Sequence, residues 1–95
     1  MKEIKYTEHL KLRLMVRKIP FNYPKIIYEN PEQKFFDNFE GTKIAVKKLK
    51  YNNSMRNVMI AYEEKDKVVN IVTAHPISDE KIINRLISGR WSKYG

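Results

Sequence analysis

The run KVVNIVTAHP, from Lys67 to Pro76, most constrains what this chain can fold into. Its apolar, β-branched residues fall on both faces of an extended chain, which is typical of a buried strand inside a sheet. The closing proline ends the strand, because proline has no N–H to donate to a neighbouring strand. Strict alternation gives one face four members that become polar toward the carboxyl end: Val69, Ile71, Thr73 and His75. This strand therefore predicts the floor of a site that offers a hydroxyl group and an imidazole.

Length and composition limit the classes of protein that need considering. A chain of 95 residues with 42% hydrophobic content predicts one domain over residues 1–95 with a modest core. The chain has no cysteine and two histidines, so we expect no thiolate chemistry, no metal site and no cofactor. The sequence shows neither a signal peptide nor an apolar run of membrane-spanning length, and we expect a cytoplasmic protein without a membrane partner.

The net charge of +8 and the pI of about 9.7 predict an anionic partner. Nucleic acid, an acidic protein and a lipid surface all carry such charge. The plain alternative is a basic protein whose charge serves no partner. Nucleic acid is the partner that a small, strongly basic domain favours most.

The first third of the chain predicts one short strand and two helices. Glu3 to Tyr6 predicts a short edge strand. Glu8 to Ile19 contains neither glycine nor proline and predicts a helix that Pro20 stops. A second, short helix is expected from Tyr23 to about Asn30, with Asn22 as its N-cap.

The remainder of the chain predicts a sheet followed by a helix. Three strands are expected ahead of the Lys67–Pro76 run: Gln33–Phe39, Lys43–Tyr51 and Arg56–Glu63. Ser78 can cap a last helix, which Gly89 is well placed to end. The predicted fold class is therefore α+β, with two N-terminal helices, a four-stranded antiparallel meander and a C-terminal helix.

Three residues of the first predicted helix recur every four positions and form one slowly rotating line: His9, Arg13 and Arg17. Apolar residues flank this line on both sides. Lys11 and Lys18 lie opposite the line, where the helix is expected to face solvent. The line of His9, Arg13 and Arg17 is therefore not expected to be the most exposed part of the helix.

This series of motifs resembles an uncharacterised family of small domains placed alongside the RelE/ParE toxin superfamily, near the BrnT-type toxins. The resemblance comprises the H-x3-R-x3-R run, the Ile19-Pro20 and Asn30-Pro31 pairs, the meander and VTAHP, and it spans Ile4 to Pro76. It implies a RelE-like, barnase-type fold and often a ribonuclease toxin that a partner antitoxin neutralises. Members are not all toxins, and some ParE-type relatives act on DNA gyrase.

Metal-independent RNA cleavage needs a base for the 2′-hydroxyl, an acid for the leaving 5′-oxygen and cations for the phosphorane. His9 and His75 suit either proton role, because imidazole titrates near neutrality. Arg13 and Arg17 offer planar forks to phosphate, and Thr73 offers a hydroxyl donor. These five form the predicted catalytic set. The sequence leaves open whether the helix line meets the end of the Lys67–Pro76 strand.

A second set of residues predicts contacts with RNA. RelE-type enzymes carry a basic and aromatic cluster late in the sheet and in the tail, and this chain resembles that pattern loosely. The predicted RNA-binding residues are basic or aromatic: Lys48, Lys50, Arg90, Trp91 and Tyr94.

Every one of these residues also has a structural explanation. His9 can orient the start of its helix, His75 can be a turn residue, and Thr73 can be an ordinary strand threonine. The two arginines can pair with carboxylates of Asp37, Glu40 or Glu63. The lysines can protect a strand edge, and Trp91 and Tyr94 can pack on the sheet.

Two classes of function follow from the sequence. One is a toxin-like, metal-independent endoribonuclease, acting alone or on messenger RNA at the ribosome, with an antitoxin as partner. The other is a module of the same fold that holds RNA or another protein through its basic face without catalysis.

Overall fold

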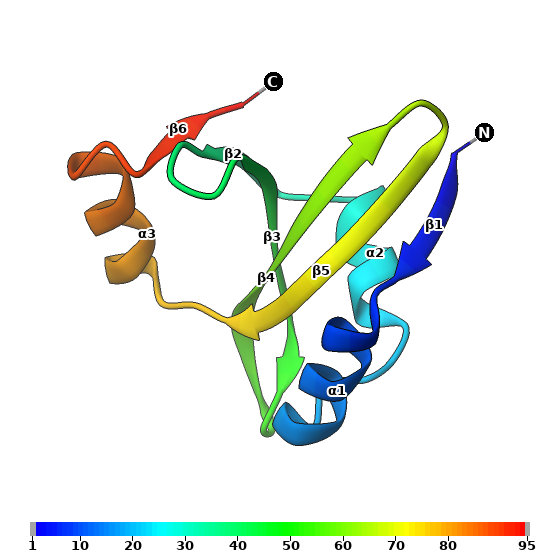
Figure 1. The fold of residues 1–95 in the computed structure, drawn as a ribbon. Helices are drawn as coiled ribbons and strands as arrows, with labels where there is room; N and C mark the ends of the chain where they lie inside the picture. The colour runs from blue at the N-terminus through cyan, green and yellow to red at the C-terminus, as the bar shows by residue number, and fades with distance from the viewer. Residues whose placement is uncertain (1, 95) are drawn as a thin grey trace.

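Residues 2–94, which a computed structural model describes, form three helices and six strands (Figure 1). In chain order they are β1 (Glu3–Tyr6), α1 (Glu8–Arg17), α2 (Tyr23–Glu29), β2 (Gln33–Asp37), β3 (Thr42–Tyr51), β4 (Ser54–Lys65), β5 (Val68–Pro76), α3 (Asp79–Ile87) and β6 (Trp91–Lys93). The α+β class predicted from the sequence is confirmed. Within the described residues, no helix has the length and apolar character needed to cross a membrane.

The strands form one mixed sheet in the order β1-β5-β4-β3-β2-β6. Strands β2 to β5 make the predicted antiparallel meander, in which each strand pairs with the next. The predicted sheet is nevertheless too small. β1 extends it by pairing parallel with β5, and β6 extends it by pairing antiparallel with β2. The edge strand predicted at Glu3 to Tyr6 is thus confirmed, whereas the basic, aromatic tail proves to contain a strand.

β5 is an interior strand, as predicted, with β1 on one side and β4 on the other. Ile71, at its centre, is fully buried. The pairing with β4 then changes register. Tyr62 of β4 lies opposite Ile71, but the preceding residue, Ala61, lies opposite Thr73. Val72 is therefore an extra residue in β5, which is the definition of a β-bulge.

This bulge corrects the faces predicted for β5. Strict alternation places Thr73 and His75 on the face of Val69 and Ile71, and that prediction is wrong. Val69 and Ile71 belong to the core beneath α1 and α2. Because the extra residue shifts the alternation by one, Thr73 and His75 point to the other face, where His75 lies opposite Met59 of β4.

The sheet buries an apolar core on each of its faces, and helices lie to either side of it in Figure 1. The core beneath α1 and α2 is rich in aliphatic side chains, among them Leu10, Leu14, Ile27, Ile60 and Ile71. The core on the α3 face contains aromatic and aliphatic side chains, among them Phe35, Ile44, Met59, Ile82 and Trp91. Of these, Ile82 supplies the buried side chain of α3. Such limited contact leaves room beside α3 on this face.

Side-chain caps fix the starts of α1 and α3. The hydroxyl of Thr7 accepts the backbone N–H of Leu10 at 3.1 Å. The hydroxyl of Ser78 accepts that of Lys81 at 3.1 Å, which confirms the predicted cap. α1 ends at Arg17, two residues earlier than the predicted Ile19, because Lys18 adopts left-handed dihedral angles with φ of 54°.

Asn22 occupies the predicted N-cap position of α2, but its side chain does not cap the helix. Asn22 has helical dihedral angles and makes no side-chain capping bond. The first turn leaves little for Asn22 to accept, because Pro24 has no backbone N–H. The backbone N–H of Lys25 donates instead to the hydroxyl of Tyr6 at 3.2 Å. A side chain from β1 thus satisfies the helix start that a local cap satisfies elsewhere in the chain.

Candidate active-site cleft

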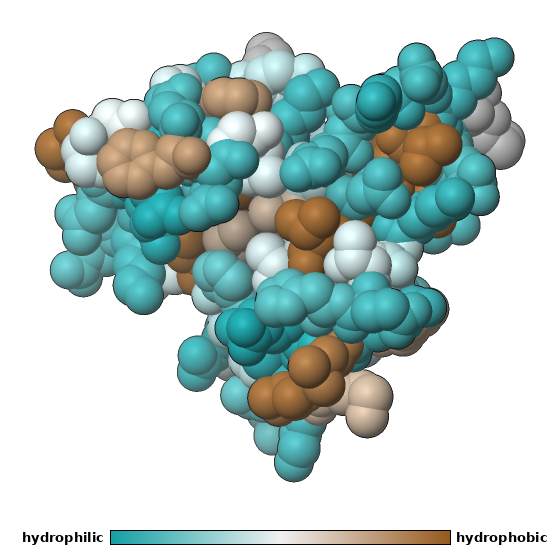
Figure 2. Space-filling view, viewed as in Figure 1, coloured by the Kyte–Doolittle hydropathy of each residue, from teal (hydrophilic) through white to brown (hydrophobic). Residues whose placement is uncertain are grey.

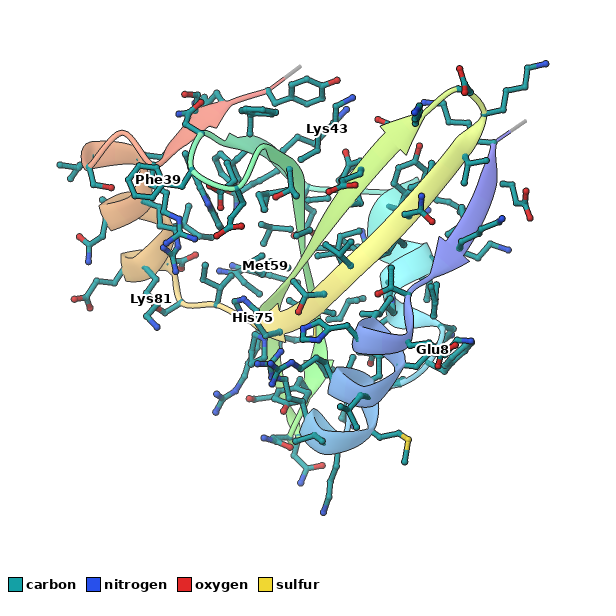
Figure 3. All side chains as sticks on the ribbon, viewed as in Figure 1. Glu8, Phe39, Lys43, Met59, His75 and Lys81 are labelled. Atoms are coloured by element: carbon teal, nitrogen blue, oxygen red, sulfur yellow. The ribbon has the colours of Figure 1, made fainter. Side chains whose placement is uncertain are left out.

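A cleft of about 260 Å³ opens on the α3 face of the sheet. Its floor is apolar and comes from the adjacent strands β3, β4 and β5: Ile44, Met59, Ala61 and Val72. Figure 2 shows apolar surface between hydrophilic side chains on this side of the molecule. In Figure 3, Met59 and His75 lie beside one another between α1 and α3. The cleft therefore combines an apolar floor with a polar rim.

Three of the predicted catalytic residues line this cleft together: His9, Thr73 and His75. Thr73 and His75 reach it because of the bulge in β5. His9 reaches it from the first turn of α1, which Thr7 fixes by donating its backbone N–H to the carbonyl of Ile71 at 3.2 Å. α1 thus starts beside β5 where β1 ends. The sequence leaves open whether the His9, Arg13 and Arg17 line meets the end of the Lys67–Pro76 strand. In the structure the two come together at His9.

The two arginines of the predicted catalytic set bind neighbouring groups and do not line the cleft. Arg13 donates from Nε to Nε2 of His9 at 3.2 Å, and Arg17 donates from Nη1 to the carbonyl oxygen of Ala74 at 2.8 Å. Within residues 2–94, neither arginine forms an ion pair with a carboxylate. Arg17 supplies β5 with a hydrogen-bond donor beyond the end of β1, and Arg13 orients His9.

His75 is held in a form that can accept a proton. Burial of the half-buried imidazole and the positive charges of Arg17, Arg85 and Lys81 lower the pKa of His75. The hydrogen bond with the Pro76 carbonyl raises the pKa, but the net value stays below the ordinary 6.5. Its Nδ1 lies 3.0 Å from the Pro76 carbonyl oxygen, which can only accept, so we place the hydrogen on Nδ1. Nε2 then carries a lone pair, as a general base requires.

His9 is arranged differently from His75. Its side chain is exposed, and its Nε2 accepts the hydrogen bond from Arg13. An imidazole nitrogen that accepts has no hydrogen, so the neutral ring carries its hydrogen on Nδ1. His9 therefore presents its Nδ1–H as a hydrogen-bond donor.

Asp37 is a buried carboxylate at the rim, and it holds Arg90. Burial alone raises the pKa of Asp37. Four donors bind the carboxylate and together lower its pKa below the ordinary value: the backbone N–H groups of Glu40 and Phe39, the Trp91 indole and the Arg90 guanidinium. The Arg90 contact, from Nε to Oδ2, measures 3.4 Å. Arg90, which the sequence assigns to RNA, thus lines the cleft and forms an ion pair with Asp37 there.

Arg85 of α3 is the functional candidate that sequence reasoning missed. Its half-buried side chain lines the cleft, and its guanidinium lies 5.5 Å from the centre of the Trp91 ring. Within residues 2–94 it forms no ion pair, and its Nε is buried without a hydrogen-bond partner. A cation with an unused donor beside His75 is suited to an anionic oxygen. No motif in the sequence singles it out from the other polar residues of α3.

The remaining predicted RNA-binding residues lie in three different environments. Trp91 is buried at the cleft rim and stacks on Phe35 with ring centres 5.2 Å apart, so its ring packs on the sheet. Tyr94 is half-buried near two lysine ammonium groups. Lys48 and Lys50 are exposed on β3, outside the cleft. Lys48 lines a separate depression of about 500 Å³ at the start of α3.

Among residues 2–94, no three histidine, aspartate or glutamate side chains are grouped so that they could hold a metal ion. Comparison of the chain with protein-family models, with curated proteins and with solved structures finds no match in any of the three. The function must therefore be inferred from the cleft itself.

Proposed function

We propose that this protein is a toxin-like, metal-independent endoribonuclease of the cytoplasm, which a partner antitoxin neutralises. The RelE-like, barnase-type fold is part of the proposal, and two helices ahead of a meander with one helix after it support it. The observation that carries the proposal is that His9, His75 and Arg85 line one cleft. Two imidazoles and a cation are the groups that metal-independent RNA cleavage needs.

In this mechanism the apolar floor holds a nucleobase and the rim holds the phosphate that follows it. His75 accepts the 2′-hydroxyl proton on Nε2, and the 2′-oxygen attacks phosphorus. Arg85 and the hydroxyl of Thr73 bind the non-bridging oxygens as negative charge grows on them. The bond from phosphorus to the 5′-oxygen breaks, and protonated His9 gives that oxygen its proton. The products are a 2′,3′-cyclic phosphate and a free 5′-hydroxyl.

Protonation of His9 changes its contact with Arg13. Both ring nitrogens of an imidazolium donate, so a protonated His9 cannot accept the hydrogen bond that Arg13 now donates. The guanidinium then turns away and becomes available to the phosphate. Arg13 thus contributes to catalysis through the state of His9.

Cleavage of a short fluorescent RNA in EDTA tests this proposal. His75→Ala should lower the cleavage rate roughly 10²- to 10⁴-fold while leaving RNA affinity unchanged, because a general base contributes that much to the chemical step. Arg85→Ala should lower the rate roughly 10²-fold or more. Lys93→Ala, which removes an exposed cation of β6, is the control and should cleave normally. Running the assay with and without ribosomes decides between free RNA and translated messenger RNA as substrate.

Growth provides an independent test of the toxin assignment. Expression of the wild-type chain without a partner should arrest growth, whereas His75→Ala should not. Normal growth at high expression, together with intact messenger RNA and no cleavage in vitro, contradicts the enzyme.

The second candidate function is a module that binds RNA or a protein without cleaving it. The bond from Arg13 to His9 favours it, because this bond gives His9 a structural role in its neutral form. In that case the wild-type protein binds RNA and leaves it intact. Lys48→Ala should then weaken binding and lower the slope of log affinity against log salt by about one, since one phosphate contact is lost.

A further inference from the structure

The outer face of α1 is apolar although its inner face is already buried. Leu10 and Leu14 of α1 are buried in the core that the sheet forms with α1 and α2. On the outer side, Leu12, Met15 and Val16 remain 58%, 77% and 67% exposed. Their spacing of three and four residues places them on one side of the helix, and we call these three residues the α1 stripe. Figure 2 shows apolar surface at the position of α1.

Positively charged and basic side chains border the α1 stripe on both sides. At 100° per residue, Lys11 and Lys18 lie along one border, and His9 and Arg13 lie along the other. Within residues 2–94, Lys18 forms no ion pair, and the ion pair of Lys11 is with exposed Glu8 of the same helix. A complementary surface is therefore apolar along its centre and acidic along its borders.

We propose that the α1 stripe is the docking surface for an acidic, amphipathic helix of a partner protein. Helix packing on helix covers a stripe of this spacing with a matching stripe. RNA supplies the negative charge but no aliphatic surface to cover three apolar side chains. A second copy supplies the aliphatic surface but brings the same basic borders together, in a chain with a net charge of +8. An acidic amphipathic helix satisfies both requirements.

Such docking also has a consequence for the cleft. His9, Arg13 and Val16 lie on adjoining sides of α1, with His9 about two turns before Val16. A partner helix that covers Val16 and continues along α1 past Arg13 therefore also covers His9. The partner then closes the cleft to RNA. This consequence depends on the proposed nuclease function, whereas the docking itself does not.

A synthetic peptide provides the probe. We would use about 20 residues, long enough for a helix, with leucines at helical spacing along one face and glutamates along its borders. A peptide of the same composition in scrambled order is the control. Titration into the isotope-labelled protein should shift the backbone NMR signals of α1, and the scrambled peptide should bind at least tenfold more weakly.

Protein variants test the location of the docking surface. Leu12→Gln with Val16→Gln should weaken the amphipathic peptide roughly tenfold or more, because both side chains lose their apolar partners. Both positions are exposed, so the fold should be unaffected. Ile87→Gln is the matched control, since Ile87 is 79% exposed on α3, and it should bind the peptide normally.

Several outcomes overturn the proposal. Equal binding of the scrambled peptide shows that charge alone suffices. Stronger shifts of the α1 signals with poly-U RNA or with phosphatidylglycerol vesicles assign the surface to nucleic acid or lipid. A dimer in sedimentation that Val16→Gln dissociates assigns it to a second copy. If the peptide binds α1 and RNA cleavage persists, occlusion of the cleft is wrong while docking stands. If the free protein cleaves no RNA, the proposed function fails and the titration still decides docking.

Discussion

The two faces of the sheet differ in how completely they are filled. On the face of α1 and α2, aliphatic side chains such as Leu10, Ile27 and Ile60 leave no exposed surface of their own. On the face of α3, the core stops beside that helix, and a cleft lined by histidines and arginines takes its place. Asp37 and Asn57, which are buried and polar, also lie around this second face.

This difference separates stability from chemistry within one small domain. The filled face removes apolar area from water, which is the main source of stability. The open face keeps polar groups partly solvated, so that their protonation states and contacts can change. β5 contributes to both faces: Val69, Ile71 and Ala74 pack into the filled face, and the bulge turns Thr73 and His75 toward the open face.

The largest effect on stability is expected from the filled face. Ile71→Ala should lower the free energy of unfolding by about 2–5 kcal/mol, because it leaves a cavity in a packed core. Urea denaturation measures this change. Ile83→Ala, at a position of α3 that is 54% exposed, is the control and should lie within about 0.5 kcal/mol of wild type. Similar losses at the two positions contradict the division of roles.

A smaller loss is expected on the open face, from Asp37→Asn. The substitution removes the charge that Arg90 pairs with and weakens acceptance from the Trp91 indole. The free energy of unfolding should fall by about 1–3 kcal/mol. Glu40→Gln removes an exposed carboxylate of the same rim and should change little. An unchanged melting temperature for Asp37→Asn shows that the buried carboxylate is dispensable.

The filled face has its own polar contribution, which depends on pH. Lys2, with help from Lys43 and Tyr28, lowers the pKa of Glu64 from 4.5 to about 2. A lowered carboxyl pKa stabilises the folded state fully above pH 4.5, and this stabilisation is lost as pH falls from 4.5 toward 2. Wild type should therefore lose stability across this window more steeply than Glu64→Gln. Parallel pH profiles of unfolding free energy for the two proteins contradict this linkage.

The smallest effect is expected within the cleft, from Arg85→Gln. Removal of this positive charge should raise the pKa of His75, since Arg85 is one of the cations that lower it. His75 then gains its proton at a higher pH as acid is added. The proposed RNA cleavage, which needs neutral His75, should then begin to fall at a higher pH. NMR titration of the imidazole measures the shift without any assay. Lys93→Gln is the control, and an equal shift there rules out a specific influence of Arg85.

The sequence by itself determined the local elements of this protein. The β-branched run of β5 predicted an interior strand. The absence of glycine and proline from Glu8 to Ile19, followed by Pro20, predicted α1, because such patterns act over a few neighbouring residues. The same pattern placed His9 and Arg13 one turn apart, and they are in hydrogen-bond contact. The resemblance and the spacing together also named His9, Thr73 and His75, which the structure finds lining one cleft.

The tertiary structure alone decided how these elements combine. The bulge at Val72 follows from pairing with β4, which a pattern of alternation along one strand does not contain. At the start of α2, the hydroxyl of Tyr6 accepts the backbone N–H of Lys25, which lies 19 residues further along the chain. This contact takes the place of the side-chain cap predicted at Asn22. Arg85 becomes a cleft residue because α3 packs beside β6 and the sheet. Contacts between residues distant in sequence depend on packing, and packing is settled only when the whole chain folds.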